Sequence, residues 1–449
     1  MADVDDLLTL ASGIAGQAGT GEHIEAYVAR ATDTAVRVYE GEVEHFTSAQ
    51  SEGIGIRVVR DGRIGFAYAG TLEPDAVAEV LAAARDNVTF GTPDEWAGLA
   101  EPDGVPVVEQ DLWRDELLAM PTADKIALAK ELERLTLAAD SRVRVDEADY
   151  ADVQAEGAVA TSTGIATSGR ETGAYLSVST LADDGDVTHT GFGFTVGRSP
   201  ADFDPEKAAR EAAERATRLL GATKPATGKV TVVLDPFVSA QLIGIIGSTL
   251  NGEAVLKGRS IFAGRVGEDV AASNLTLIDD PTNPLAYTAS EIDGEGLATR
   301  RNVLIEGGVL QKFVQSSYSA RRSGAAPTGN ATRGGFKSTP GCGCLALSLV
   351  PGTRSQAELI ADVDEGVLIQ MVQGLHSGVN AVSGDFSTGA SGLMIRGGQL
   401  AEPVREFTIA STLQRMLKDV VEVGGDIDWL PMGAAGVSLV IRDVTMSGV

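Results

Sequence analysis

This chain of 449 residues contains few side chains that bind metals through sulfur or nitrogen. It has two cysteines and four histidines, and no two histidines are spaced as in a helical metal motif. Cys342 and Cys344, in "GCGC", have no histidine near them in sequence. Thiols at alternate positions of a strand point to opposite faces, so a disulfide between them would be strained. We predict small, buried, reduced cysteines and no zinc site at this segment.

Long apolar runs and positive charge are also scarce. No run of 18 apolar residues occurs, which predicts no membrane-spanning helix. The N-terminal "MADVDDLLTL" is acidic and lacks the basic start of a signal peptide, so we expect a cytoplasmic protein. The formal net charge of −27 disfavours nucleic acid and anionic lipid as direct partners.

Common catalytic motifs are missing as well. There is no G-x-S-x-G nucleophile elbow. The segment "KPATGKV" lacks the first glycine of a phosphate loop and has Val230 where a Ser or Thr would hold magnesium. The adjacent Asp279 and Asp280 precede a proline, a context in which we expect turn hydrogen bonds rather than metal binding.

The residues that are present predict an α+β protein with two domains. Hydrophobic residues make up 43% of the chain, enough for two cores. We place an N-terminal α+β domain with antiparallel sheet and helices at residues 1–225. A C-terminal domain of mostly antiparallel β structure, barrel-like or sandwich-like, follows at residues 226–449, after the connection "ATKPATG".

Local patterns place the elements of the first domain. The stretch 53–70 reads as a hairpin around Asp61-Gly62. Apolar residues at helical spacing predict helices at 73–88 and from Pro121 onward. Residues 142–198 read as antiparallel strands, and a helix near 204–221 begins with Asp204 as its N-cap. In the second domain a strand at 229–234 leads into "QLIGIIGSTLNG", and the pattern from about residue 271 is mostly β, with a hairpin around Gly307-Gly308.

The segment "VSGDFSTGASG", residues 382–392, combines small side chains, permissive glycines and one acid, Asp385. Glycine in a strand allows another backbone to approach closely, and that backbone is either a bound peptide or a neighbouring strand. The spacing alone favours the neighbouring strand or a bulge over the peptide.

This segment and its continuation through "GGDI" closely resemble the PmbA/TldE branch of the TldD/PmbA family. The stretches "VRVYEGEVEHFTSAQSEGIGIRVVRDGRIGFAYAG" and "GRSIFAGRVGEDVAASNLTLIDDPT" resemble it too, so the similarity covers essentially the whole chain. The family is associated with zinc-dependent peptidases that act on unfolded or small peptides. The resemblance implies a TldD-like partner that carries a His-Glu-x-x-x-His helix and a later cysteine ligand, in a heterodimer of two similar folds.

The resemblance also places that metal helix on this chain. Ile243 takes the first His position, Gly244 the catalytic Glu position and Ser248 the second His position, and the cysteine position falls near Ala435. None of these residues can supply the three ligands and the general base that a zinc peptidase needs. The implied role is a non-catalytic subunit without metal or cofactor of its own, with zinc in the partner. Residues expected to contact an extended peptide through strand addition are Ser383, Gly384, Asp385, Ser387, Gly389 and Ser391.

Two alternatives remain at the level of sequence. One is a self-sufficient hydrolase with Cys342, Ser248 or Ser391 as nucleophile, although no motif places a base beside them. The other is a homodimeric peptide-binding or regulatory protein with no role in proteolysis.

Overall fold

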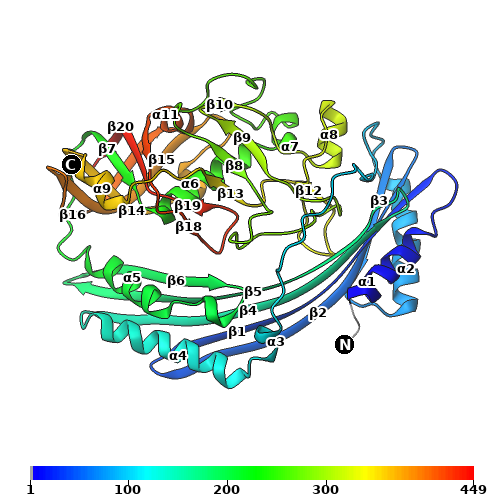
Figure 1. Cartoon of the computed structure of the whole chain (residues 1–449), viewed down its shortest axis with the longest axis horizontal. Helices are drawn as coiled ribbons and strands as arrows, with labels where there is room; N and C mark the ends of the chain where they lie inside the picture. Colours follow the sequence, from blue (N-terminus) through cyan, green and yellow to red (C-terminus); the bar gives the residue numbers. More distant parts are fainter. Residues whose placement is uncertain (1–3) are drawn as a thin grey trace.

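A computed structural model describes residues 4–449 of the chain as two layers (Figure 1). The first layer is a long, curved antiparallel sheet built by the N-terminal half. The second is a β-rich body built by the C-terminal half, which lies over one face of that sheet. The predicted α+β class is confirmed.

The N-terminal sheet has six strands in the order β3-β2-β1-β4-β5-β6. In chain order they are β1 (Glu22–Tyr39), β2 (Glu42–Arg60), β3 (Arg63–Ala69), β4 (Val143–Thr161), β5 (Ala166–Asp184) and β6 (Val187–Gly197). The predicted Asp61-Gly62 hairpin joins β2 to β3, and both turn residues have positive φ, 51° and 69°. Such a turn follows the natural twist of the two strands.

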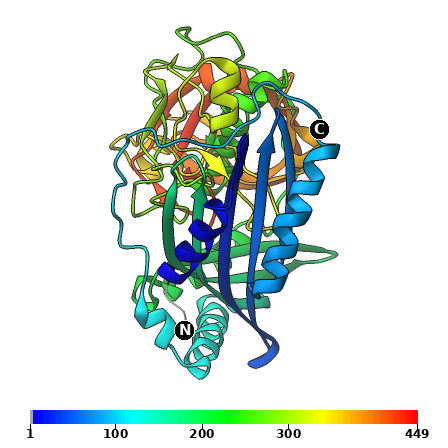
Figure 2. The same ribbon diagram turned by 90° about the vertical axis from the view of Figure 1, so that its right-hand side faces the viewer.

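Helices cover the outer face of this sheet, away from the C-terminal body (Figures 1 and 2). They are α1 (Val4–Ala15), α2 (Pro74–Asn87), α4 (Thr122–Ala139) and α5 (Pro205–Thr217), with the short α3 (Asp115–Ala119) in the connection. The side chains that α2 buries, Val77, Val80, Leu81 and Ala84, have the helical spacing on which its prediction rests. Asp204 caps α5 as predicted, because its carboxylate accepts the backbone N–H of Lys207. The helix ends four residues before Gly221, earlier than expected.

The C-terminal body centres on a small closed barrel. Five strands form it, because β16 at one end of the sheet also pairs with β20 near the other end. They are β7 (Gly228–Leu234), β14 (Glu365–Gln373), β15 (Asp385–Arg396), β16 (Gln399–Thr412) and β20 (Leu439–Ser447), with β17 (Val420–Val423) as an extra neighbour of β20. All pairs are antiparallel except β7 with β14. The barrel-like alternative of the prediction is therefore the observed one.

Shorter elements complete the body. A second sheet contains β8 (Leu277–Asp279), β9 (Asn302–Glu306), β10 (Val309–Leu310) and β13 (Leu347–Leu349). Two further pairs join β11 (Ala331–Thr332) to β12 (Gly341–Cys342) and β18 (Asp428–Trp429) to β19 (Ala435–Gly436). The helices are α6 (Pro236–Thr249), α7 (Gly252–Leu256), α8 (Ser317–Ser323), α9 (Gln356–Ala361), α10 (Leu375–Gly378) and α11 (Leu413–Lys418).

No helix within residues 4–449 has the length and apolar character needed to cross a membrane. The strands of the first sheet end before residue 226, and those of the barrel begin after it. The division into domains at 225/226 stays a prediction.

Candidate functional site

Helix α6 carries the positions that the family resemblance assigns to a metal helix. Asp235 caps it by accepting the backbone N–H of Phe237, and Pro236 occupies the first turn. Ile243 is buried in the core between the barrel and the second sheet. Gly244 and Ser248 lie on an exposed stripe, where a Cβ added to Gly244 would meet no atom within 4 Å. The helix thus presents an open surface at two of the three assigned positions, Gly244 and Ser248.

The residues of this stripe do not suit zinc. Ser248 donates its hydroxyl to the carbonyl of Ile245 at 2.6 Å, and Gly244 has no side chain. Ala435, at the assigned cysteine position, is buried in β19, which packs against α6. Across residues 4–449 no three His, Cys, Asp or Glu side chains gather closely enough to hold a metal ion. The helix offers zinc no ligand, and the absence of a metal from this subunit stays a prediction.

The two cysteines lie behind α6 as free thiols. As whole residues both are only partly buried, so the prediction of buried cysteines is not met for the complete residues. Their sulfur atoms nevertheless face protein: Cys344 Sγ lies 3.6 Å from the Gly247 carbonyl and Cys342 Sγ 3.4 Å from the Val314 carbonyl. Burial of the sulfur raises the pKa of both thiols, which disfavours a reactive thiolate.

None of the three candidate nucleophiles is paired with a base among the residues that the structure describes. Among residues 4–449, the one histidine side chain in a hydrogen bond is His45, and its partner is Thr47. Within the described part of the chain, Cys342, Ser248 and Ser391 have no imidazole or carboxylate hydrogen-bonded to them. The geometry gives no support to a serine or cysteine hydrolase.

The predicted peptide-contact segment forms the turn before β15 and the first half of that strand. Asp385 and Ser387 are exposed, while Phe386, Thr388 and Ala390 are buried. Ser383 donates its hydroxyl to Asp385 at 2.7 Å, so this acid caps the turn before β15. Gly384, Gly389 and Ser391 lie in the same turn and strand.

Strand β15 has no free edge. It pairs with β16 along its whole length, and with β14 from Gly389 to Arg396. Before Gly389 the neighbouring loop takes the place of β14, since the N–H of Asn380 bonds the carbonyl of Asp385 at 2.9 Å. The expectation of an accessible edge here is therefore wrong, and the glycines allow the close approach of neighbouring strands. Contact of these side chains with a peptide stays a prediction.

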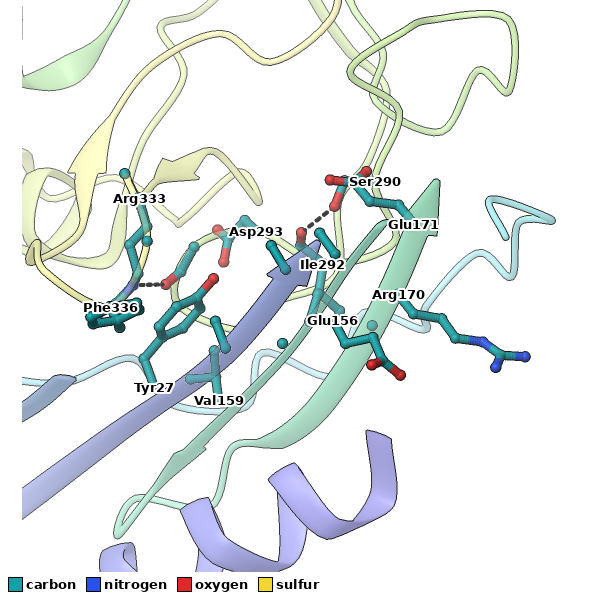
Figure 3. Close-up of a pocket in the computed structure, with 18 of the residues that line it drawn as sticks. Tyr27, Glu156, Val159, Arg170, Glu171, Ser290, Ile292, Asp293, Arg333 and Phe336 are labelled. Carbon is teal, nitrogen blue, oxygen red and sulfur yellow. Dashed lines mark hydrogen bonds between the residues drawn. The ribbon is translucent and has the colours of Figure 1, made fainter. Parts of the chain in front are cut away.

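A large hollow lies between the two layers, where the C-terminal loops face the inner surface of the N-terminal sheet (Figure 3). It measures about 810 Å³, within the usual size range of ligand sites. Its floor is made of small residues on adjacent strands, which leave room above the sheet: Ala29, Ala31, Ala155, Gly157 and Gly169. Tyr27, Tyr287, Phe336 and the loops around 290–294 and 331–337 form its walls.

Most charged groups around this cavity already have partners. Arg30 pairs with Glu156, and Arg170 lies over the ring of Trp113. Glu291 accepts the backbone N–H of Gln110 at 2.6 Å. Asp293 accepts three backbone N–H groups, but burial and the nearby Glu295 raise its pKa to about 7. These contacts stabilise the walls, and Glu156, Glu291 and Asp293 each use at least one oxygen in them.

Glu171 differs from the other acids of the cavity. Its side chain has no hydrogen bond or ion pair with residues 4–449, and it remains accessible within the cavity. Protein surrounds it on most sides, and this partial removal from water raises the pKa of its carboxyl group, while Arg198 acts in the opposite direction. The Arg198 guanidinium is itself bound to the carbonyls of Thr172, Ala286 and Tyr287 at 2.9, 3.3 and 3.2 Å.

A buried ionic network fixes the loops to the sheet at one end of the cavity. Glu25 of β1 binds both Arg57 and Arg333 at 2.6 Å, and Arg57 lies 3.6 Å from Glu295. Burial acts to raise the pKa of Glu25, but the two guanidinium groups outweigh it and hold that pKa below its ordinary value. Arg333 also covers the ring of Tyr27 at 4.7 Å. The network holds the two layers in one arrangement.

Sequence reasoning missed this cavity and its residues. Most of its lining comes from β1, β4, β5 and two loops more than 100 residues further along the chain, and Ser51 of β2 adds to it. Alternation within each strand marks which residues share a face, but only the register of the three strands shows that the small residues adjoin. No local motif connects them with Glu171.

The acidic pair predicted to form turn hydrogen bonds is divided between two roles. Asp280 accepts the N–H and hydroxyl of Thr282, as predicted. Asp279 lies buried in β8, where it accepts the N–H groups of Leu345 and Ala346 and the amide of Asn330. Burial raises the pKa of Asp279 to about 6.

Comparison with known proteins assigns nearly the whole chain to one group. Family models for the PmbA/TldA metallopeptidase domain 1, central domain and C-terminal domain match residues 24–88, 115–220 and 227–448. Metalloprotease PmbA of Escherichia coli is 28% identical, over 91% of this chain and 89% of its own length. A metalloprotease TldD homologue of Haemophilus influenzae is 25% identical, over 95% and 93% of the two chains. The crystal structure of TldE from Thermococcus kodakarensis aligns with this chain over 100% of both chains, with a TM-score of 0.90 and 24% sequence identity. The two proteins therefore share the fold.

Proposed function

This chain belongs to the PmbA/TldD metallopeptidase family, and we propose that it is the metal-lacking subunit of a two-chain zinc peptidase. The observation that carries the proposal is the exposed stripe of α6. Gly244 at the general-base position and Ser248 at the second ligand position are open to the surface, while Ile243 at the first ligand position faces the core. A family fold with an accessible but ligand-free metal helix supports a structural role beside a catalytic partner.

The partner in this proposal is a TldD-like chain that supplies zinc and its general base, and it pairs with this chain through the C-terminal domains. Relatives named for both TldD and PmbA match this chain along most of its length, which supports pairing of similar folds. The exposed stripe of α6 lies in the C-terminal body and has no covering element within residues 4–449. A homodimer in the absence of that partner is the alternative arrangement.

The substrate in this proposal is an unfolded peptide, held in an extended conformation at the cleft between the layers. Strand addition needs an unpaired edge, and β2 has one beyond β3, at residues 42–53. Every side chain from Glu42 to Glu52 is exposed, and Ser51 lines the cavity. Long edges are usually blocked by Pro or Lys, and this segment contains neither. The free edge of β2 is long enough to form several backbone hydrogen bonds with a bound peptide, and such bonds depend little on the sequence of the peptide.

The test is peptide cleavage by this chain alone, by a TldD-like partner alone and by the two together, each with and without a metal chelator. The proposal predicts cleavage that needs the partner and is abolished by the chelator. Chelator-insensitive cleavage by the single chain contradicts it. Size measurement of the single chain and of the mixture decides between a homodimer and a heterodimer. The cytoplasmic location expected from the sequence stays a prediction.

A further inference from the structure

We propose that Glu171 forms a subsite in the interlayer cavity for a positively charged group of the bound peptide, a Lys or Arg side chain or an N-terminal ammonium. The inference rests on the proposed peptide-binding role and adds a preference in substrate class to it. It starts from the contrast between Glu171 and the other acids of the cavity (Figure 3).

The charges of the cavity walls leave one carboxylate for a ligand. Glu156 is paired with Arg30, Glu291 with a backbone N–H, and Asp293 with three backbone N–H groups. Glu171 has no such partner within residues 4–449. Arg198, the nearest cation that acts on it, directs its guanidinium hydrogen bonds to three backbone carbonyls instead. A carboxylate that is partly removed from water and has no cation bound to it is strongly stabilised when a ligand supplies a positively charged hydrogen-bond donor.

Neighbouring groups add acceptors suited to an ammonium or a guanidinium. Ser290 also lines the cavity and donates its own proton to the Ile292 carbonyl at 2.7 Å, so its oxygen is free to accept a hydrogen bond. Tyr287 lines the same wall. It lies over Gly173, which follows Glu171 by two residues in β5. A cationic group carries several N–H donors, which one carboxylate and one hydroxyl oxygen can satisfy together.

The floor of the cavity explains how a peptide could place that group. Ala29, Ala31, Ala155, Gly157 and Gly169 leave space for a backbone above three paired strands, and Glu171 stands directly across from Ala155 in the register. The free edge of β2 joins the cavity at Ser51. A peptide that runs from this edge over the small residues reaches Glu171 on β5, three strands away. The preference for a positively charged group therefore applies to those peptide residues that lie inside the cavity.

The test is binding of short unstructured peptides, labelled with a fluorophore, measured by fluorescence anisotropy with the chain alone and with the two-chain complex. One N-acetylated peptide carries a single central Lys, a twin carries norleucine there, and a third has norleucine with a free N-terminal amine. Glu171→Gln removes the carboxylate. Glu291→Gln is the matched control, because it makes the same charge change in the same cavity but keeps an oxygen for the Gln110 N–H.

The proposal predicts that the Lys peptide binds about tenfold more tightly than its norleucine twin, as expected for one charged hydrogen-bonded pair. Glu171→Gln abolishes this difference and Glu291→Gln preserves it. The third peptide shows whether a terminal ammonium serves as well as a side chain. Equal binding of all three peptides, an unchanged Lys preference in Glu171→Gln, or no peptide binding to either preparation overturns the subsite. The cleavage assay with chelator decides the metal-lacking role separately, since binding requires no cleavage.

Discussion

Two glycines of α6 illustrate how the same residue serves different purposes one turn apart. Both should destabilise a helix interior relative to alanine. Gly244 is exposed with open space around it, whereas a Cβ on Gly247 would come within 2.1 Å of Leu347 Cδ1. Packing requires glycine at 247, and nothing within residues 4–449 requires it at 244.

We therefore predict opposite effects of two alanine substitutions on the free energy of unfolding, measured by urea denaturation of the single chain. Gly244→Ala should stabilise the protein by about 1 kcal/mol, the helix-propensity gain. Gly247→Ala should destabilise it by about 1 kcal/mol or more, because Leu347 must move within a packed core. Equal effects of the two changes would contradict the assignment of their faces.

Glu171 gives a prediction about pH. A carboxyl group binds a cation only in its ionised form. Because the pKa of Glu171 is raised, its ionised form is lost at a higher pH than that of an ordinary Glu. Affinity for the Lys peptide should therefore fall as the pH is lowered, beginning above the ordinary Glu range. The titratable groups that interact electrostatically with Glu171 are Arg198, Tyr27 and Tyr287, and the tyrosines stay neutral throughout. Arg30, Glu156, Arg170, Glu291, Asp293, Arg333 and Lys337 also line the cavity.

The matched measurement uses Glu171→Gln, which should bind the Lys peptide weakly and with little change over the same pH range. A parallel pH response in wild type and variant would assign the titration to another group, such as Asp293, and would remove this support for the subsite.

Elements whose signals are local were predictable from the sequence. Helix α2 buries the positions given by its periodicity, and the Asp61-Gly62 turn forms the expected hairpin. Strand β15 was recognised as unusual because of its glycines, but its neighbours were not predictable. Strand β15 is paired with β14 on one edge and with β16 on the other. These pairings belong to the closed barrel, and no local sequence pattern encodes that closure.

The free edge belongs instead to β2, and proline substitutions test it. Backbone N–H groups of a strand point alternately toward each neighbour, so Thr47 and Ser48 donate in opposite directions. One of Thr47→Pro and Ser48→Pro removes a bond to β1 and should lower the melting temperature. The other removes only an outward N–H, and it should keep the melting temperature and weaken peptide binding several-fold. Unchanged peptide binding in the variant that keeps its melting temperature would argue against addition at this edge.

At the scale of the whole molecule, the sequence predicts the class and a barrel-like or sandwich-like C-terminal body, but not the cavity between the layers. The cavity depends on how two halves of the chain meet, and their contact is made by residues distant in sequence. Glu25 and Arg333 are 308 positions apart, yet they form a buried ion pair. A charged pair of this kind has no signature in sequence, because each residue alone looks like an ordinary surface charge.

Loss of Arg333 should therefore destabilise the contact between the layers. Arg333→Met leaves Glu25 buried with one partner fewer, for which we expect a loss of about 3 kcal/mol in the free energy of unfolding. The pKa of Glu25 is lowered in the folded protein. The stabilisation that its ion pairs give is therefore present at neutral pH and is lost as the pH falls through the lowered pKa of Glu25. The control Arg134→Met removes an exposed pair with Glu131 and should leave the urea midpoint unchanged. Equal midpoints for wild type and Arg333→Met would show that the network does not hold the layers.

The most direct test of the central claim is the zinc content of the purified chain and of its complex with a TldD-like partner, measured by inductively coupled plasma mass spectrometry. The exposed stripe of α6 offers zinc no ligand, so the account predicts no retained zinc in the single chain. It predicts zinc in the complex, in proportion to the partner subunit. Stoichiometric zinc in the single chain, lost when Gly244 or Ser248 is replaced by a bulky apolar residue, would contradict it.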